Sequence, residues 1–194
     1  MALEEIGLPY RVHPLDHTGG EFDGAAYGRL SPFRQAPVID DDGFVVAESA
    51  AILLYLAEKA GKLIPADAEG RTRVTQWCFA ALATVELPLA EILMIDKFGD
   101  GTAEKRRAWL VTWAGRVLGN LKRRLDGRTW IACADFTVAD ILLACVLREV
   151  RTTDLIEPYP RLKAYYARAL ARPAWERTLG AYAQRHGVEA ADIR

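Results

Sequence analysis

Residues 31–56 read SPFRQAPVIDDDGFVVAESAAILLYL, and this stretch decides the fold. Two β-rich runs, 38–39 and 44–46, flank an Asp-Gly turn, a pattern typical of a β-hairpin. Pro37 lacks an N–H group and therefore suits the first residue of a strand. Ser49 fits the N-cap of a helix, because apolar residues recur at helical spacing after it. The stretch thus predicts a strand, a turn, a second strand and an amphipathic helix.

The expected helix start at Ser49 can hold a charged ligand. Free backbone N–H groups and the helix dipole favour an anion there, and the Ser49 hydroxyl can add a hydrogen bond. Glu48 can pair with an ammonium group. A carboxylate and an ammonium on one carbon define the end of an amino acid. A simpler interpretation also fits these residues, in which Ser49 only caps its helix and Glu48 is solvated.

This segment resembles the N-terminal, thioredoxin-like domain of the cytosolic glutathione S-transferase family, in its bacterial type. The resemblance implies a cis peptide bond at Ala36–Pro37, where the Ala36 backbone receives the cysteinyl part of glutathione. It implies that Glu48 and Ser49 bind the γ-glutamyl end. Arg34 or Gln35 would reach the glycyl carboxylate or the peptide. The residues that the resemblance assigns to glutathione are Gln35, Ala36, Pro37, Glu48 and Ser49.

The resemblance continues through nearly the whole chain. Residues 136–141, FTVADI, resemble the family's capping box, with Thr137 at the N-cap and Asp140 bonding back to it. The implied fold class is α+β, an incomplete thioredoxin-like N-terminal domain followed by an all-helical glutathione-transferase C-terminal domain. We expect the first domain to cover residues 1–62 and the second to cover residues 68–194.

The family's first strand and catalytic loop have no counterpart here. The chain begins MALEEIG, which resembles the last turns of the family's first helix. The catalytic residue is therefore unknown. The strand expected at residues 10–15 would lie roughly 10 Å from the hairpin, too far to pair with it. We expect that the sequence is truncated upstream, that the first domain has rearranged, or that a partner strand fills the gap.

The second domain is predicted to be all helix. A long helix is expected over residues 71–98, kinked at Pro88 because proline removes a backbone hydrogen bond. Further helices are expected from Thr137 and over residues 160–171 and 173–185. The resemblance implies a homodimer, and an acceptor pocket walled by the long helix. Its candidate residues are Ile92, Leu93, Ile95 and Phe98, for which core packing is the competing interpretation.

Composition indicates a soluble protein of a reducing compartment. The 194 residues are 51% hydrophobic with a net charge of −1, and basic clusters such as 122–124 fit solvated helix faces. We expect no nucleic-acid partner. We expect no apolar run long enough to span a membrane and no signal peptide. Three cysteines without CxxC spacing and the scattered His13, His17 and His186 predict no metal site. We expect a cytoplasmic location.

The resemblance implies a glutathione S-transferase-like enzyme. Glutathione is then a substrate whose thiolate attacks a small apolar electrophile, and no metal takes part. The alternative is a non-catalytic member of the family that acts as a binding or regulatory protein. A third possibility is a remnant without a stable first domain.

Overall fold

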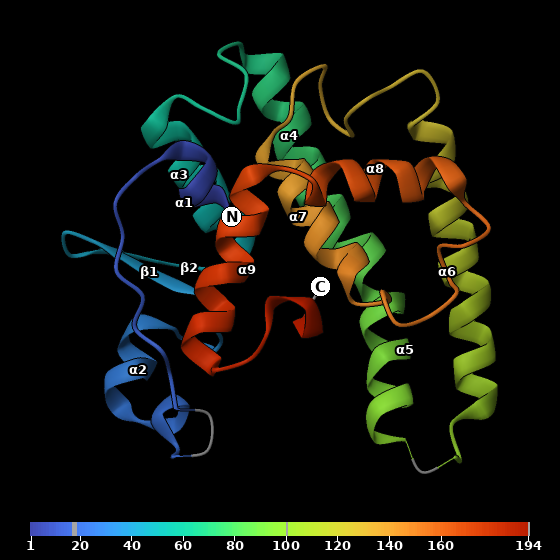
Figure 1. The fold of residues 1–194 in the computed structure, drawn as a ribbon, viewed down its shortest axis with the longest axis horizontal. Helices are drawn as coiled ribbons and strands as arrows, with labels where there is room; N and C mark the ends of the chain where they lie inside the picture. Colours follow the sequence, from blue (N-terminus) through green and yellow to red (C-terminus); the bar gives the residue numbers. More distant parts are fainter. Residues whose placement is uncertain (17–18, 100, 194) are drawn as a thin grey trace.

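The computed structural model describes residues 1–16, 19–99 and 101–193, so His17 lies outside the described residues. Figure 1 shows a small β-hairpin at one side of a mostly helical molecule. Short turns of 3₁₀ helix cover Glu21–Asp23 and Ala190–Ile193. The other elements are α1 Ala2–Ile6, α2 Ala25–Leu30, β1 Val38–Asp41, β2 Phe44–Ala47, α3 Ser49–Ala60, α4 Ala68–Ala80, a π-helical segment Ala81–Glu86, α5 Leu87–Phe98, α6 Glu104–Arg124, α7 Val138–Arg148, α8 Pro160–Leu170 and α9 Pro173–His186.

The predicted hairpin is confirmed. β1 and β2 pair antiparallel, with Val38 opposite Ala47. Asp42 and Gly43 form the turn with positive φ angles of 52° and 91°, as a two-residue hairpin turn requires. Within the described residues this hairpin is the only sheet. The strand expected at residues 10–15 is wrong, because these residues run as a loop that pairs with no neighbouring strand edge.

The N-terminal helix α1 is tied to the last long helix. Both Glu5 carboxylate oxygens accept hydrogen bonds from Arg172, at 2.5 and 2.9 Å. Glu4 accepts hydrogen bonds from Arg177 and from the Tyr10 hydroxyl, each at 2.7 Å. Beneath these contacts a small apolar core joins α1 to α3, formed by Ile6, Ile52 and Leu56. The two ends of the chain therefore support the hairpin and α3 together, and Figure 1 shows α1 beside α9.

The long helix of the second domain runs from α4 through the π-helical segment into α5. It begins at Ala68 instead of residue 71, because the Asp67 side chain caps it by accepting from the Gly70 N–H at 2.7 Å. Pro88 sits in its interior as predicted and has no N–H to donate to the preceding turn. The wider π-helical turn stands directly before Pro88, where that hydrogen bond is lost.

The expectation that no apolar segment is long enough to span a membrane is wrong for this long helix. By length and composition alone, Ala68–Phe98 could cross a bilayer, with a mean hydropathy of 1.9 in an 18-residue window that is 33% buried. The core helix of a globular protein passes the same test. One face of this helix packs into the core of the second domain. Its buried residues are Val74, Cys78, Ala81, Val85, Leu89 and Ile92.

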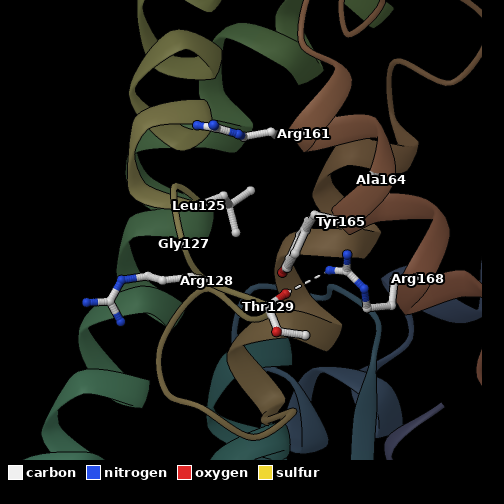
Figure 2. A pocket seen from close by; sticks show the side chains of 8 residues that line it. All are labelled: Leu125, Gly127, Arg128, Thr129, Arg161, Ala164, Tyr165 and Arg168. Carbon is white, nitrogen blue, oxygen red and sulfur yellow. Dashed lines mark hydrogen bonds between the residues drawn. The ribbon is translucent and has the colours of Figure 1, made fainter.

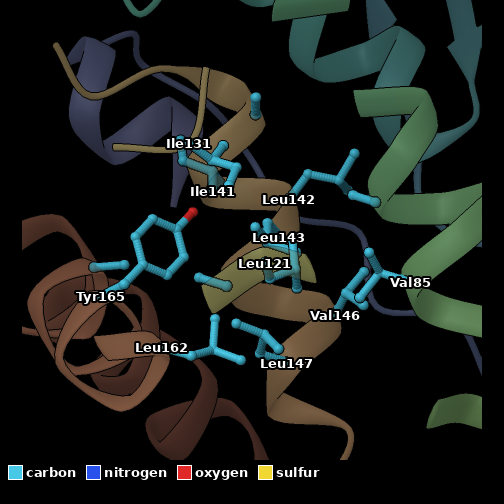
Figure 3. Packing of buried hydrophobic residues seen from close by; sticks show 14 of the residues in the cluster. Val85, Leu121, Ile131, Ile141, Leu142, Leu143, Val146, Leu147, Leu162 and Tyr165 are labelled. Carbon is cyan, nitrogen blue, oxygen red and sulfur yellow. The ribbon is translucent and has the colours of Figure 1, made fainter. Parts of the chain in front are cut away.

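Helix α7 lies at the centre of the second domain, as its nearly unbroken apolar sequence predicts. Figure 3 shows its side chains packed against Val85 of the long helix, Leu121 of α6, and Leu162 and Tyr165 of α8. A backbone hydrogen bond of 3.0 Å from the Val138 N–H to the Leu63 carbonyl joins the start of α7 to the segment after α3. This core therefore fixes the second domain against the first.

The predicted capping box at the start of α7 is confirmed. Asp140 is fully buried and accepts from the Thr137 N–H at 2.9 Å and its hydroxyl at 3.0 Å. It also accepts from the Ile131 N–H at 2.8 Å and the Tyr165 hydroxyl at 3.0 Å. Burial raises the pKa of Asp140, and these hydrogen bonds oppose the rise. The Asp140 carboxylate thus caps α7 and also links Thr137, Ile131 and Tyr165 to one another.

Candidate functional site

A cavity of about 330 Å³ lies where the hairpin domain meets the long helix. All five residues that the sequence assigned to glutathione line it, together with Leu82 and Glu86 of the π-helical segment. The loop before β1, the start of α3 and the second domain each contribute a wall. The structure therefore brings the predicted binding residues together, and their role toward a ligand stays a prediction.

The loop before β1 is held in place by a buried serine. The predicted cis peptide bond at Ala36–Pro37 is present. The Gln35 carbonyl accepts from the Tyr27 hydroxyl at 2.9 Å and from the Ser31 hydroxyl at 3.0 Å. The Gln35 N–H donates back to Ser31 Oγ at 3.0 Å. Ser31 is thus a structural residue, and its hydrogen bonds leave Gln35, Ala36 and Pro37 exposed at the cavity.

The start of α3 differs by one residue from the prediction. Glu48, not Ser49, occupies the N-cap position, and its carbonyl accepts the first helical hydrogen bond from the Ile52 N–H at 2.9 Å. Ser49 is the first helical residue, and its hydroxyl makes no hydrogen bond within the described part of the chain. The N–H groups of a first helical turn lack helical acceptors and attract anions. The Ser49 hydroxyl is thus available to a ligand.

Glu48 has an unusual backbone conformation. Its φ of 72° falls in a region that side chains rarely adopt. Such strain is typical of ligand-binding segments, where the surrounding structure maintains it. The conformation sets the Glu48 side chain, which is exposed, beside Ser49 at the edge of the cavity.

Arg34 does not reach the cavity. Its guanidinium donates to the Asp23 carbonyl and lies 3.7 Å from the Asp23 carboxylate. The alternative in which Arg34 holds the glycyl carboxylate is therefore not supported by its position. Gln35 lines the cavity and remains the candidate for that part of the ligand.

Glu86 is a cavity residue that the sequence reasoning missed. Its carboxylate makes no hydrogen bond or ion pair in the segments that the structure describes. Burial, and then the charge of Glu149, raise its pKa. With Glu48 it gives the cavity two carboxylates and no basic side chain among the described lining residues. The sequence signal that could have identified Glu86 is its position as a single acidic residue in an apolar stretch, two residues before Pro88.

The predicted acceptor pocket needs a correction. Ile92 is fully buried in the core of the second domain and cannot wall an open pocket. Leu93 and Ile95 are half-buried, and Phe98 is 74% exposed near the end of α5. None of the four lines the cavity with Ser49. For Leu93, Ile95 and Phe98 an acceptor role stays a prediction.

The described lining contains no Cys, Tyr or His side chain, so the catalytic residue stays unidentified. The three cysteines lie in the second domain, and burial raises the pKa of Cys78 to about 12, which keeps it a thiol. Burial also raises the pKa of the half-buried Cys133. Across residues 1–16, 19–99 and 101–193, no three His, Cys, Asp or Glu side chains gather as metal ligands.

Comparison with known proteins supports the resemblance. Residues 1–59 match the profile of the glutathione S-transferase N-terminal domain, and residues 114–168 match that of the C-terminal domain. Glutathione S-transferase D7 of Drosophila melanogaster is 27% identical over 189 residues, covering 92% of this chain and 81% of its own length. The disulfide-bond oxidoreductase YfcG of Escherichia coli strain K12 is 30% identical over 183 residues, covering 89% and 84%.

A similar solved structure is a glutathione transferase of Burkholderia graminis that holds two glutathione molecules per subunit. It is 33% identical with a TM-score of 0.84, and the match covers 91% of this chain and 79% of that chain. These similarities confirm the predicted fold class, a thioredoxin-like N-terminal domain followed by an all-helical domain.

Proposed function

This chain belongs to the glutathione S-transferase family, and we propose that it binds glutathione in the cavity beside Ser49 and conjugates the glutathione thiol to a second substrate. One observation supports this proposal above the others. The five residues that the family resemblance assigns to glutathione line a single cavity of about 330 Å³.

The cavity offers a partner for each charged group at the γ-glutamyl end. The carboxylate would accept from the Ser49 hydroxyl and from the N–H groups of the first turn of α3. The ammonium would lie near the carboxylates of Glu48 and Glu86, which no described basic residue of the lining neutralises. The cysteinyl backbone would pair with the N–H and carbonyl of Ala36, as an added strand pairs with a sheet edge.

The proposed reaction is conjugation. The glutathione thiol loses its proton to solvent or a base, and the thiolate forms a carbon–sulfur bond with a small apolar electrophile. The electrophile's leaving group departs with the electron pair of the broken bond. Ser49, Glu48 and Ala36 contribute by positioning glutathione, which fixes the thiol relative to the electrophile. Leu82 is the apolar side chain that the cavity offers to such an acceptor.

Thiol–disulfide exchange is a second candidate function. The 30% identical relative of E. coli is named a disulfide-bond oxidoreductase, and the B. graminis structure holds two glutathione molecules per subunit. In this reaction two glutathione thiols are oxidised to glutathione disulfide, while a substrate disulfide is reduced to two thiols. The protein would hold both glutathione molecules and needs no cysteine of its own.

Parallel assays separate these candidates. Purified protein is given glutathione with 1-chloro-2,4-dinitrobenzene in one assay and with 2-hydroxyethyl disulfide in the other. Conjugate formation above the uncatalysed rate supports transfer, and disulfide reduction supports exchange. Binding to immobilised glutathione without either reaction would identify the non-catalytic alternative. Absence of binding and of both reactions would refute the proposal.

A homodimer is part of the proposal, because the long helix has an exposed apolar face. Its large exposed residues are Phe79, Leu87, Met94 and Phe98. Contiguous exposed apolar residues are typical of protein interfaces. Light scattering after size-exclusion chromatography is expected to give twice the chain mass, and Leu87→Glu is expected to give a monomer. A monomeric wild-type protein would contradict this part.

We also propose a cytoplasmic location. The three cysteines are free, which suits a reducing compartment where glutathione is abundant. Fractionation of cells that express the tagged protein tests this, and recovery with the membrane or the medium would contradict it.

A further inference from the structure

A second cavity, of about 320 Å³, lies between the loop that follows α6 and one face of α8. Figure 2 shows this cavity, with Arg161 above and with Arg128 and Arg168 on either side of Thr129. It shares no lining residue with the cavity beside Ser49. Three of its lining residues are arginines, and none of those described is acidic.

The spacing along α8 sets two of these arginines on one helix face. Arg161, Ala164, Tyr165 and Arg168 follow the i, i+3, i+4 and i+7 pattern of one side of a helix. Ala164 has a small side chain, which leaves open space between the two guanidinium groups. The Tyr165 hydroxyl is already bound to Asp140 at 3.0 Å, so the polar groups that α8 offers to the cavity are the arginines.

The arginines differ in how firmly they are held. Arg168 donates to the Thr129 carbonyl at 2.9 Å and lies 5.6 Å from the centre of the Trp130 ring. Arg161 pairs with Asp126 at 2.6 Å. These contacts fix guanidinium groups at two sides of the cavity before any ligand arrives, which reduces the entropy lost on binding.

Arg128 completes the positive charge. It follows Gly127, whose φ of 67° turns the chain after α6, and its side chain is exposed. It makes no hydrogen bond or ion pair within the described ranges. Asp126 offsets one of the three guanidinium charges, so the surroundings of the cavity remain positive by two.

A simpler role for these arginines would be to offset the negative end of the α6 dipole. That end already carries Lys122, Arg123 and Arg124 in its last turn. Arg124 further donates to the carbonyls of Ile131 and Ala132, at 3.0 and 3.2 Å. The helix end is therefore neutralised without the three arginines of the cavity.

We propose that this cavity binds a small anion that carries phosphate groups. Planar guanidinium groups match phosphate oxygens with paired hydrogen bonds, and a remaining charge of about two favours a ligand with at least two negative charges. The cavity volume of about 320 Å³ suits a compact molecule such as a phosphorylated metabolite. The site shares no lining residue with the glutathione cavity, so the anion would not compete with glutathione for the same residues.

Calorimetric titration of the 194-residue chain with inorganic pyrophosphate, at fixed ionic strength, tests the proposal. Saturable binding of one pyrophosphate per chain is expected. Arg128→Gln and Arg168→Gln are each expected to weaken the affinity about tenfold, since each removes a charged hydrogen-bond donor. Arg116→Gln is the matched control, because Arg116 is exposed on α6 and does not line the cavity.

Four results would overturn the proposal: no saturable binding, equal weakening by Arg116→Gln, equally tight binding of succinate, or displacement of pyrophosphate by glutathione. Arg128→Gln keeps the test valid if Arg168→Gln disturbs the loop, because the Arg128 side chain has no described structural contact. Circular dichroism of each variant confirms that its helical content is retained.

Discussion

Replacing Ser49 by alanine isolates the interaction on which the proposed binding mode depends. The Ser49 hydroxyl neither caps α3 nor bonds another described residue, so its loss removes no contact of the folded protein. Alanine is also a better helix former than serine. The variant is therefore expected to be at least as stable as the wild type, and any loss must appear in ligand binding.

The size of that loss follows from the expected bond. A hydroxyl that donates to a carboxylate contributes about 1.5–3 kcal/mol when both groups leave water. The cavity is open and the backbone N–H groups of α3 remain, so the lower part of this range applies. A loss of about 1.5–2 kcal/mol corresponds to roughly a 10- to 30-fold rise in the dissociation constant for glutathione.

Isothermal titration calorimetry with S-methylglutathione measures this change without turnover. Thr84→Ala is the matched control, because it removes an exposed hydroxyl from the long helix outside the cavity lining. Its dissociation constant is expected to equal that of the wild type. An unchanged affinity in Ser49→Ala would refute the reasoning, and so would equal losses in the two variants.

Two further predictions concern the buried Asp140 and the half-buried Glu86. Asp140→Ala leaves the hydrogen-bond donors of Ile131, Thr137 and Tyr165 without an acceptor. Urea denaturation is therefore expected to show a free energy of unfolding lowered by about 3 kcal/mol or more. The control Asp135→Ala, at an exposed position, should change it by less than about 0.5 kcal/mol. Similar values for both would contradict the network. Burial and Glu149 raise the folded pKa of Glu86 above 4.5, so its ionisation costs stability as pH rises from about 4.5 through that raised value. Glu86→Gln is thus expected to melt at a higher temperature than the wild type at pH 7, and this difference in melting temperature is expected to shrink toward pH 4.5. The variant is also expected to bind glutathione more weakly. A difference that widens at low pH would reverse the assigned sign.

Local sequence patterns predicted the parts of the fold that short-range chemistry controls. The Asp-Gly turn, the capping box of Thr137 and Asp140, and the helical core pattern of α7 are all present. Each depends on residues within one or two turns of one another. The five binding residues also came from one stretch of sequence, with the family resemblance supplying their common target.

Contacts between residues far apart in the sequence determined the features that the sequence did not predict. The family resemblance implied a strand at residues 10–15, but these residues have no neighbouring strand to pair with, so they form a loop. Glu86 reaches the cavity only because the long helix, through α4, packs against α3 of the first domain. Ile92 was predicted to line the acceptor pocket but is fully buried in the core, because helical spacing alone does not distinguish a core-facing residue from a ligand-facing one.

The central claim is that glutathione lies in the cavity formed by the loop before β1, the start of α3 and the π-helical segment. A crystal structure of the protein with S-methylglutathione tests it most directly. We predict that the γ-glutamyl carboxylate lies within hydrogen-bond distance of the Ser49 hydroxyl, and the ammonium near Glu48 and Glu86. Glutathione bound elsewhere, or no bound ligand at saturating concentration, would contradict the account.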